Sequence, residues 1–145
     1  MPTSENERIT DETFAAWNAH DPERYVEWIA DDYVWESDSF PFPIKGREAV
    51  KTVMKMYFAA FPDIKFEIET SVASGNCVAK AWIATGTHKA EFLGVPATNK
   101  QVSVRGCTII ELKDGKIVKS TAYSDRMALM EQFGITKPAA SASYA

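Results

Sequence analysis

Two titratable side chains could carry proton transfer in this chain, Asp125 and His88. The residues of 116–123 alternate as a strand does, and this alternation places Asp125 on the same face as Tyr123. A carboxylate in apolar surroundings has a raised pKa, which suits the removal of a proton next to a carbonyl. The imidazole of His88 titrates near neutrality and could orient a substrate oxygen or transfer a proton. We therefore predict Asp125 and His88 as catalytic residues. Asp125 also directly precedes a predicted helix at residues 126–133, so it is equally suited to cap that helix.

Helices are expected first along the chain. Residues 4–20 carry apolar side chains at near-helical spacing and predict an amphipathic helix. Pro22 suits the first turn of a second helix, which is expected to stop near residues 31–32. A long, largely buried helix is predicted from Gly46 until Pro62 closes it.

Strands dominate the rest of the chain. Residues 33–36 predict a short strand, and the prolines of residues 40–43 make a loop at a rim. Four longer strands are expected at residues 64–72, 77–87, 101–112 and 116–123. Helices followed by antiparallel strands predict an α+β fold, a curved, mostly antiparallel sheet wrapped by N-terminal helices into a cone. The hollow of the cone is the expected site.

Side-chain alternation indicates which residues face the hollow. In residues 101–112 the apolar set includes Gly106, Thr108 and Ile110, so this set should point inward, with Gly106 leaving space. Thr108 is then a polar group on an apolar wall, and its hydroxyl could also be satisfied by neighbouring groups. Trp82 shares its parity with Lys80, which predicts that Trp82 points to the outer face of the sheet.

Four segments of the chain resemble the SnoaL-like polyketide cyclases of the nuclear-transport-factor-2-like superfamily. They are residues 82–88 (WIATGTH), 91–98 (EFLGVPAT), 114–118 (DGKIV) and 124–125 (SD). The resemblance implies the cone-shaped fold with one apolar pocket, and it places Asp125 at the acid/base position of the cyclases. It implies a structural hydrogen bond for His88 as an alternative to catalysis. By superfamily analogy, the side of the first strand that carries Tyr33, Trp35 and Ser37 faces the pocket.

These considerations predict an acid/base enzyme without a cofactor, acting on a small apolar cyclic or polyketide-like molecule. Ring closure, isomerisation, dehydration and epoxide hydrolysis all remain open. The predicted substrate-binding residues are Trp17, Tyr33, Trp35, Ser37, Phe58, Gly106, Thr108, Ile110 and Tyr123.

Departures from the related families keep other interpretations open. Residues 119–121 are Lys, Ser and Thr, where Glu, His and Trp are usual in the cyclases. The three catalytic groups of the ketosteroid isomerases are missing, and Asp38 could replace their base only with a shift of one residue. A binding or association module of the same fold, or a pocket that has lost its activity, are the alternatives.

Composition narrows the class of protein. The 145 residues carry a net charge of −4 without a basic stripe, which disfavours nucleic acid and anionic membranes as partners. No signal pattern or membrane-spanning run is evident, so a cytoplasmic location is expected. Two cysteines, expected to stay reduced, and two histidines predict no metal site. We expect one domain at residues 1–135, a flexible tail at 136–145, and a homodimer through an outer sheet face carrying Trp82, Cys107 and Ile109.

Overall fold

The computed structural model describes residues 2–135, and the predicted tail at 136–145 lies outside them. In chain order the elements are α1 (Pro2–Asn18), α2 (Pro22–Val26), β1 (Ile29–Ser37), β2 (Ile44–Lys45), α3 (Arg47–Ala60), β3 (Lys65–Ser74), β4 (Cys77–Thr87), β5 (Gln101–Lys113), β6 (Lys116–Ser124) and α4 (Arg126–Gln132). The sheet order is β2-β1-β6-β5-β4-β3, and all neighbours are antiparallel except the parallel pair of β1 and β6. The expected α+β fold with a mostly antiparallel sheet is confirmed.

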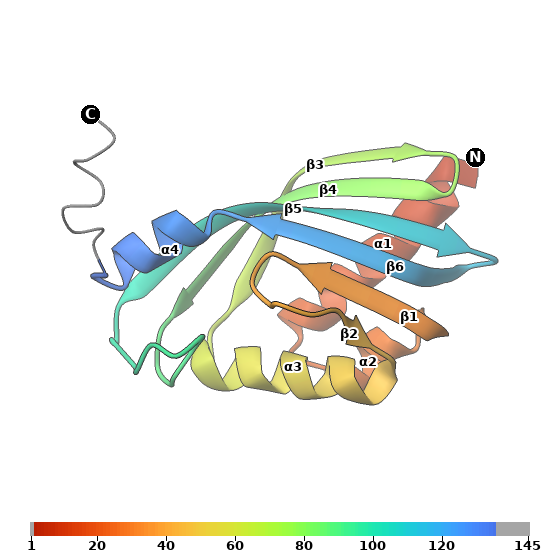
Figure 1. The fold of residues 1–145 in the computed structure, drawn as a ribbon. Helices are drawn as coiled ribbons and strands as arrows, with labels where there is room; N and C mark the ends of the chain where they lie inside the picture. The colour runs from red at the N-terminus through yellow and green to blue at the C-terminus, as the bar shows by residue number, and fades with distance from the viewer. Residues whose placement is uncertain (1, 136–145) are drawn as a thin grey trace.

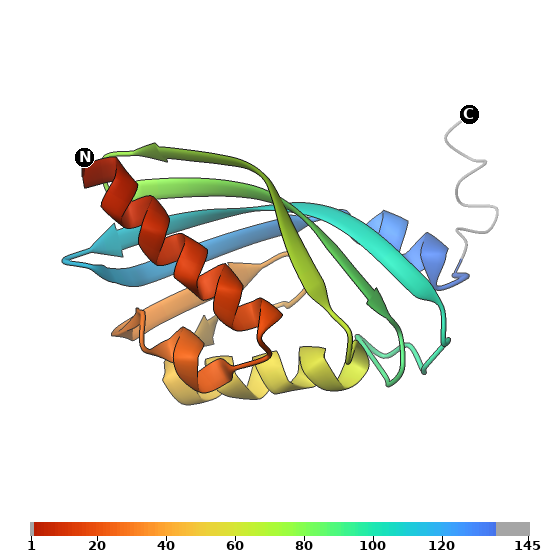
Figure 2. The same cartoon turned by 180° about the vertical axis from the view of Figure 1, so that it is seen from behind.

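The sheet arches over the helices, and α1 and α3 lie on its concave side (Figures 1 and 2). On α3, Val50 and Met54 are four residues apart and fully buried, because this spacing places them on one face of a helix. α4 lies at the end of the sheet beside β5. None of the helices within residues 2–135 is long and apolar enough to cross a membrane.

The second helix is shorter than predicted. Asp21 caps its first turn by accepting a hydrogen bond from the backbone N–H of Arg24 (3.1 Å), and Pro22 occupies the first helical position as expected. The helix ends at Val26, however, and β1 begins at Ile29, where a helix was predicted until residues 31–32. Pairing of Ile29 with Ile117 of β6 outweighs the local helical pattern in this stretch.

Two strands contain an extra residue that changes which side chains face inward. In β6, Glu111 of β5 pairs with Lys119 and Leu112 pairs with Ile117, so Val118 is extra. In β3, Ile68 pairs with Trp82 and Thr70 pairs with Ala81 of β4, so Glu69 is extra. Because side chains alternate along a strand, each bulge reverses the inward set beyond it and bends the strand.

A buried lysine joins α1 to the sheet. The side chain of Lys80 on β4 is only 1% exposed, and its ammonium group contacts Asp11 Oδ1 on α1 (2.6 Å) and Ser71 Oγ on β3 (2.8 Å). Asp11 itself is exposed, but without it the buried ammonium of Lys80 would lose its counter-charge, so this contact fixes α1 across β3 and β4.

The burial of Lys80 overturns the prediction for Trp82. The charge of Lys80 predicts a solvent-facing side of β4, but this side faces the helices, and Trp82 is only 7% exposed on the concave side. The outer face therefore lacks Trp82. It gains Tyr123, which is 57% exposed and pairs across the ladder with Cys107.

We propose that this outer face joins two copies of the chain, because Ile109 and Cys107 remain half-buried there beside the exposed ring of Tyr123. Ile109→Arg should convert the dimer to a monomer, since it places a charge at the centre of the contact. Thr52→Arg, on the exposed side of α3, is the matched control. Light scattering at micromolar concentration checks this, and a monomeric wild type would contradict it.

Candidate functional site

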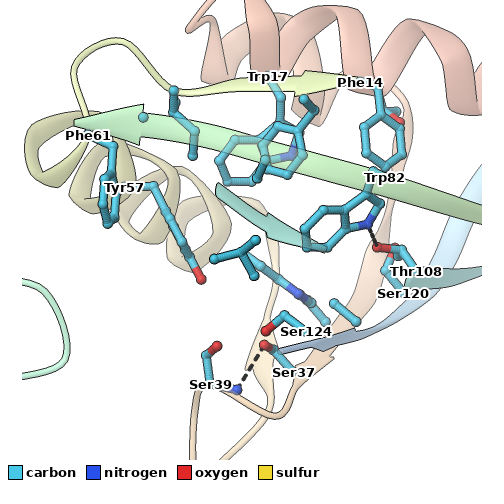
Figure 3. Close-up of a pocket in the computed structure, with 18 of the residues that line it drawn as sticks. Phe14, Trp17, Ser37, Ser39, Tyr57, Phe61, Trp82, Thr108, Ser120 and Ser124 are labelled. Atoms are coloured by element: carbon cyan, nitrogen blue, oxygen red, sulfur yellow. Dashed lines mark hydrogen bonds between the residues drawn. The ribbon is translucent and has the colours of Figure 1, made fainter. Parts of the chain in front are cut away.

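A cavity of about 140 Å³ lies between the concave face of the sheet and helices α1 and α3 (Figure 3). It is similar in size to an engineered apolar cavity of about 150 Å³ that binds benzene. Its lining side chains are mostly aromatic and aliphatic, and its polar groups are hydroxyls. No Asp, Glu, Lys, Arg or His side chain lines it in the part of the chain that the structure describes.

Aromatic rings build the wall on the helix side. The ring of Trp17 on α1 packs edge to face against Tyr57 of α3 (5.6 Å), Phe66 of β3 (5.5 Å) and Trp35 of β1 (6.1 Å). Such perpendicular contacts are favourable because the positive edge of one ring meets the negative face of another. Interlocked rings of this kind hold the wall in place and leave flat surfaces toward the hollow.

The opposite wall is formed by Trp82 lying over Gly106. A Cβ atom at Gly106 would come within 2.4 Å of two ring atoms of Trp82, so only glycine allows the indole to lie there. The indole Nε1 donates a hydrogen bond to Thr108 Oγ1 (2.9 Å), which fixes the ring plane (Figure 3). The space attributed to Gly106 is therefore occupied by Trp82.

Three hydroxyl-bearing side chains, Tyr25, Tyr33 and Ser120, gather at the buried end of the cavity, called here its closed end. The hydroxyl groups of Tyr25 and Tyr33 are 3.2 Å apart, and Ser120 lies close to both. All three side chains line the cavity and are buried. Burial raises the pKa of Tyr25 and, more strongly, that of Tyr33, so both stay neutral.

The mouth of the cavity also carries hydroxyls, from Ser37, Ser39, Tyr57 and Ser124 (Figure 3). Next to them stands the carboxylate of Asp38. Its Oδ2 accepts a hydrogen bond from the backbone N–H of Ser124 (3.1 Å), and its Oδ1 accepts one from the Ser124 hydroxyl (3.3 Å). Burial, and secondarily the negative charge of Asp38, raise the pKa of Tyr57, so its hydroxyl stays protonated.

Six of the predicted substrate-binding residues line the cavity, namely Trp17, Tyr33, Trp35, Ser37, Thr108 and Ile110. Three do not. Phe58 lies one helical position beyond Tyr57 and instead stacks on His20 (4.5 Å). Gly106 is covered by Trp82, and Tyr123 points outward because the Val118 bulge reverses the parity of β6.

Asp125 lies outside the cavity as well. Its carboxylate is exposed and accepts a hydrogen bond from the backbone N–H of Ala128 (3.0 Å), which makes it the N-cap of α4. Its backbone N–H donates to the carbonyl of Arg105 (3.1 Å) at the end of the sheet. The geometry thus gives Asp125 the capping role, and its catalytic role stays a prediction.

His88 is fully buried beside the cavity without lining it. Its Nδ1 accepts from the backbone N–H of Thr98 (3.3 Å) and lies 3.0 Å from the hydroxyl of the same residue. The ring stacks on Phe133 at 4.1 Å. These contacts tie the end of β4 to the segment before β5 and to α4, which is a structural arrangement.

No group of three or more His, Cys, Asp or Glu side chains that could hold a metal ion is found among residues 2–135. Cys77 and Cys107 are both unpaired in this part of the chain.

A known protein family matches most of the chain. The family described as SnoaL-like polyketide cyclase matches residues 7–133. The chain belongs to this family. A comparison with curated proteins found no match.

Solved structures agree with the fold of this SnoaL-like chain. AclR from Streptomyces galilaeus, a hydroxylase candidate, is 25% identical with a TM-score of 0.83, covering 99% of this chain and 95% of its own. IdmH from Streptomyces antibioticus, a polyketide cyclase candidate, is 28% identical with a TM-score of 0.77, covering 89% and 98%. A SnoaL-like protein from Jannaschia sp. CCS1 is 20% identical with a TM-score of 0.85, covering 94% and 97%.

Several lining residues were missed from the sequence, above all Tyr57, Trp82, Ser120 and Ser124. One signal was available for Tyr57. Val50, Met54, Tyr57 and Phe61 recur at intervals of four, three and four residues, which places Tyr57 rather than Phe58 on the core side of α3. The serines of β6 depend on a bulge that no local pattern marks.

The buried tyrosines of this SnoaL-like chain should make its stability fall in alkali. An unfolded tyrosine ionises near pH 10, whereas Tyr25, Tyr33 and Tyr57 have raised pKa values in the folded chain, mainly through burial. Below about pH 10 both states keep the proton and stability is unaffected. Above it the unfolded chain loses protons first, so the free energy of unfolding should decline by up to about 1.4 kcal/mol per pH unit for each tyrosine.

Urea unfolding between pH 8 and 11 measures this decline, and Tyr33→Phe should make it shallower. A free energy of unfolding that stays constant to pH 11 would contradict the burial of these hydroxyls.

Proposed function

We propose that this chain is a cofactor-independent acid/base enzyme that acts on a small apolar, ring-containing or polyketide-like molecule held in the cavity. Membership of the SnoaL-like family indicates a cyclase-type role on a small molecule. IdmH, described as a polyketide cyclase candidate, supports a polyketide-like substrate. One observation carries the proposal: an aromatic cavity without charged lining residues in the described chain has a carboxylate at its mouth.

The lining argues for an uncharged, flat substrate. Trp35, Tyr57 and Trp82 offer ring faces and edges against which another ring can pack. Burying an unpaired charge in such a site would cost several kcal/mol, and no lining group among the described residues could compensate it.

Asp38 is exposed and does not itself line the cavity, but its contacts with lining residues make it the carboxylate that we favour for proton transfer. Both of its neighbours in sequence, Ser37 and Ser39, line the cavity, and so does Ser124, which donates two hydrogen bonds to its carboxylate. In the proposed step, the carboxylate takes a proton from a carbon next to a substrate carbonyl. The resulting enolate carbon attacks a second carbonyl of the same molecule, a carbon–carbon bond forms, and the proton is returned to the new alkoxide oxygen.

The hydroxyl of Tyr57 can support this step. It remains protonated because burial and the charge of Asp38 raise its pKa. A neutral hydroxyl beside the reacting carbonyl can donate a hydrogen bond to the developing oxyanion, which is commonly a large contribution to catalysis.

The rival function is a binding module in which the cavity is filled without chemistry. A pocket that has lost its activity is the second rival, and the departures at Lys119, Ser120 and Thr121 from the usual family residues favour that one. Both rivals differ from the proposed enzyme in whether Asp38 matters for turnover of a bound molecule.

A matched pair of variants tests the proposal. Asp38→Asn keeps the size and the acceptor for the Ser124 N–H but removes the proton acceptor, so turnover should fall about 100-fold or more. Asp125→Asn retains capping ability and should leave turnover within a few-fold. The assay screens linear aryl 1,5-diketones, in which the enolate carbon can reach the second carbonyl through a six-membered ring, for ring closure by absorbance, with naphthalene binding as the check on the cavity.

Loss of turnover in Asp125→Asn alone would return the chemistry to Asp125, as the sequence predicted. Ligand binding without turnover of any substrate in the wild type would favour the binding module.

A further inference from the structure

The closed end of the cavity is polar, although the walls that lead to it are apolar. Tyr33 is 0% exposed, Ser120 is 5% exposed and Tyr25 is 7% exposed; the hydroxyls of the two tyrosines lie 3.2 Å apart, and all three side chains line the cavity. Burying a hydroxyl costs free energy unless it has a hydrogen-bond partner. A pocket that binds only apolar groups would gain nothing from hydroxyls at this position. Here the partners are mutual, and each oxygen keeps acceptor capacity beyond the bonds within the cluster.

The distance between this cluster and the mouth determines how an elongated ligand would be oriented in the cavity. Ser120 and Ser124 both face inward on β6 and are four residues apart. At about 3.3 Å per residue, the closed end and the mouth are separated by roughly 13 Å along the strand. Between them lie Ala122 of β6 and Trp35 of β1, which are apolar.

We propose that Tyr25, Tyr33 and Ser120 form a subsite that binds a neutral oxygen, phenolic or carbonyl, at the leading end of an elongated apolar ligand. This inference rests on the proposed function, and adds to it the chemistry and the orientation of the substrate. The oxygen enters first, and the opposite end of the molecule lies at the mouth beside Asp38.

The charges around the cavity explain why the oxygen is neutral. No basic side chain lines the cavity within the described residues, so a carboxylate at the closed end would be buried without a counter-charge. At the mouth the guanidinium of Arg126 donates to the backbone carbonyl of Asp38 (2.8 Å), so the carboxylate of Asp38 and this cation offset each other there and provide no net charge that would draw an anion inward. A phenol or ketone avoids the cost of burying a charge and can exchange hydrogen bonds with the cluster.

Calorimetry tests this subsite. It measures the affinity of the full chain for naphthalene, 2-naphthol and 2-naphthoate. A site without polar partners would prefer naphthalene, because 2-naphthol loses its hydrogen bonds to water on entry. With the cluster in place, 2-naphthol should bind about 3- to 10-fold more tightly than naphthalene, the gain expected from one hydrogen bond. 2-Naphthoate should bind more weakly than either.

Two variants locate the effect. Tyr33→Phe and Ser120→Ala should each remove the preference for 2-naphthol while leaving naphthalene affinity within about two-fold, and unchanged naphthalene binding shows that the cavity is intact. Ser74→Ala, at the exposed end of β3 and outside the cavity lining, should retain the preference. Two independent variants of the cluster protect the test against misfolding of either one.

The outcomes separate this inference from the function on which it rests. Naphthalene binding with no preference for 2-naphthol, or a preference that survives both cluster variants, overturns the subsite alone. Failure of naphthalene itself to bind overturns the proposed function and the subsite together.

Discussion

One extra residue in β6, Val118, decides what the last strand contributes to the cavity. The pairing of Ile117 with Leu112 and of Lys119 with Glu111 leaves Val118 unmatched, and every side chain beyond it changes face. Without this bulge, Tyr123 would point inward and the serines at 120 and 124 would point to solvent. The polar closed end and the mouth both depend on this bulge, because a shift of one residue in register moves every side chain of a strand to the opposite face of the sheet.

The aromatic side chains then keep the hollow from collapsing. The Trp82 ring can lie flat only because Gly106 has no Cβ, and its indole is fixed by Thr108. The side chains that line this hollow of about 140 Å³ have no protein atoms to contact on the side that faces it. An apolar ring that enters the cavity can make those contacts, which gives ligand binding a driving force that does not depend on charge.

Most of the fold could be predicted from the sequence because its elements follow from local patterns. The apolar face of α3, Pro22 in the first turn of α2 and the alternation of β5 are each visible within a few residues, and the predicted inward set of β5 is the one found in the structure. The site was harder because it depends on contacts between distant segments. Lys80 appeared to mark a solvent face until Asp11, far away in the chain, was found to bind it. The end of α2 was misplaced because pairing of Ile29 with Ile117 is a long-range contact.

The central claim is that an apolar ring binds within the cone, with its flat faces against the cavity walls. Intermolecular nuclear Overhauser effects between naphthalene protons and the assigned side chains of the intact chain test it most directly. The account predicts contacts to Trp35, Tyr57 and Trp82, which line the cavity from three different elements. Contacts to Ile109 and Tyr123 on the outer face, with none to the cavity side chains at saturating naphthalene, would contradict it.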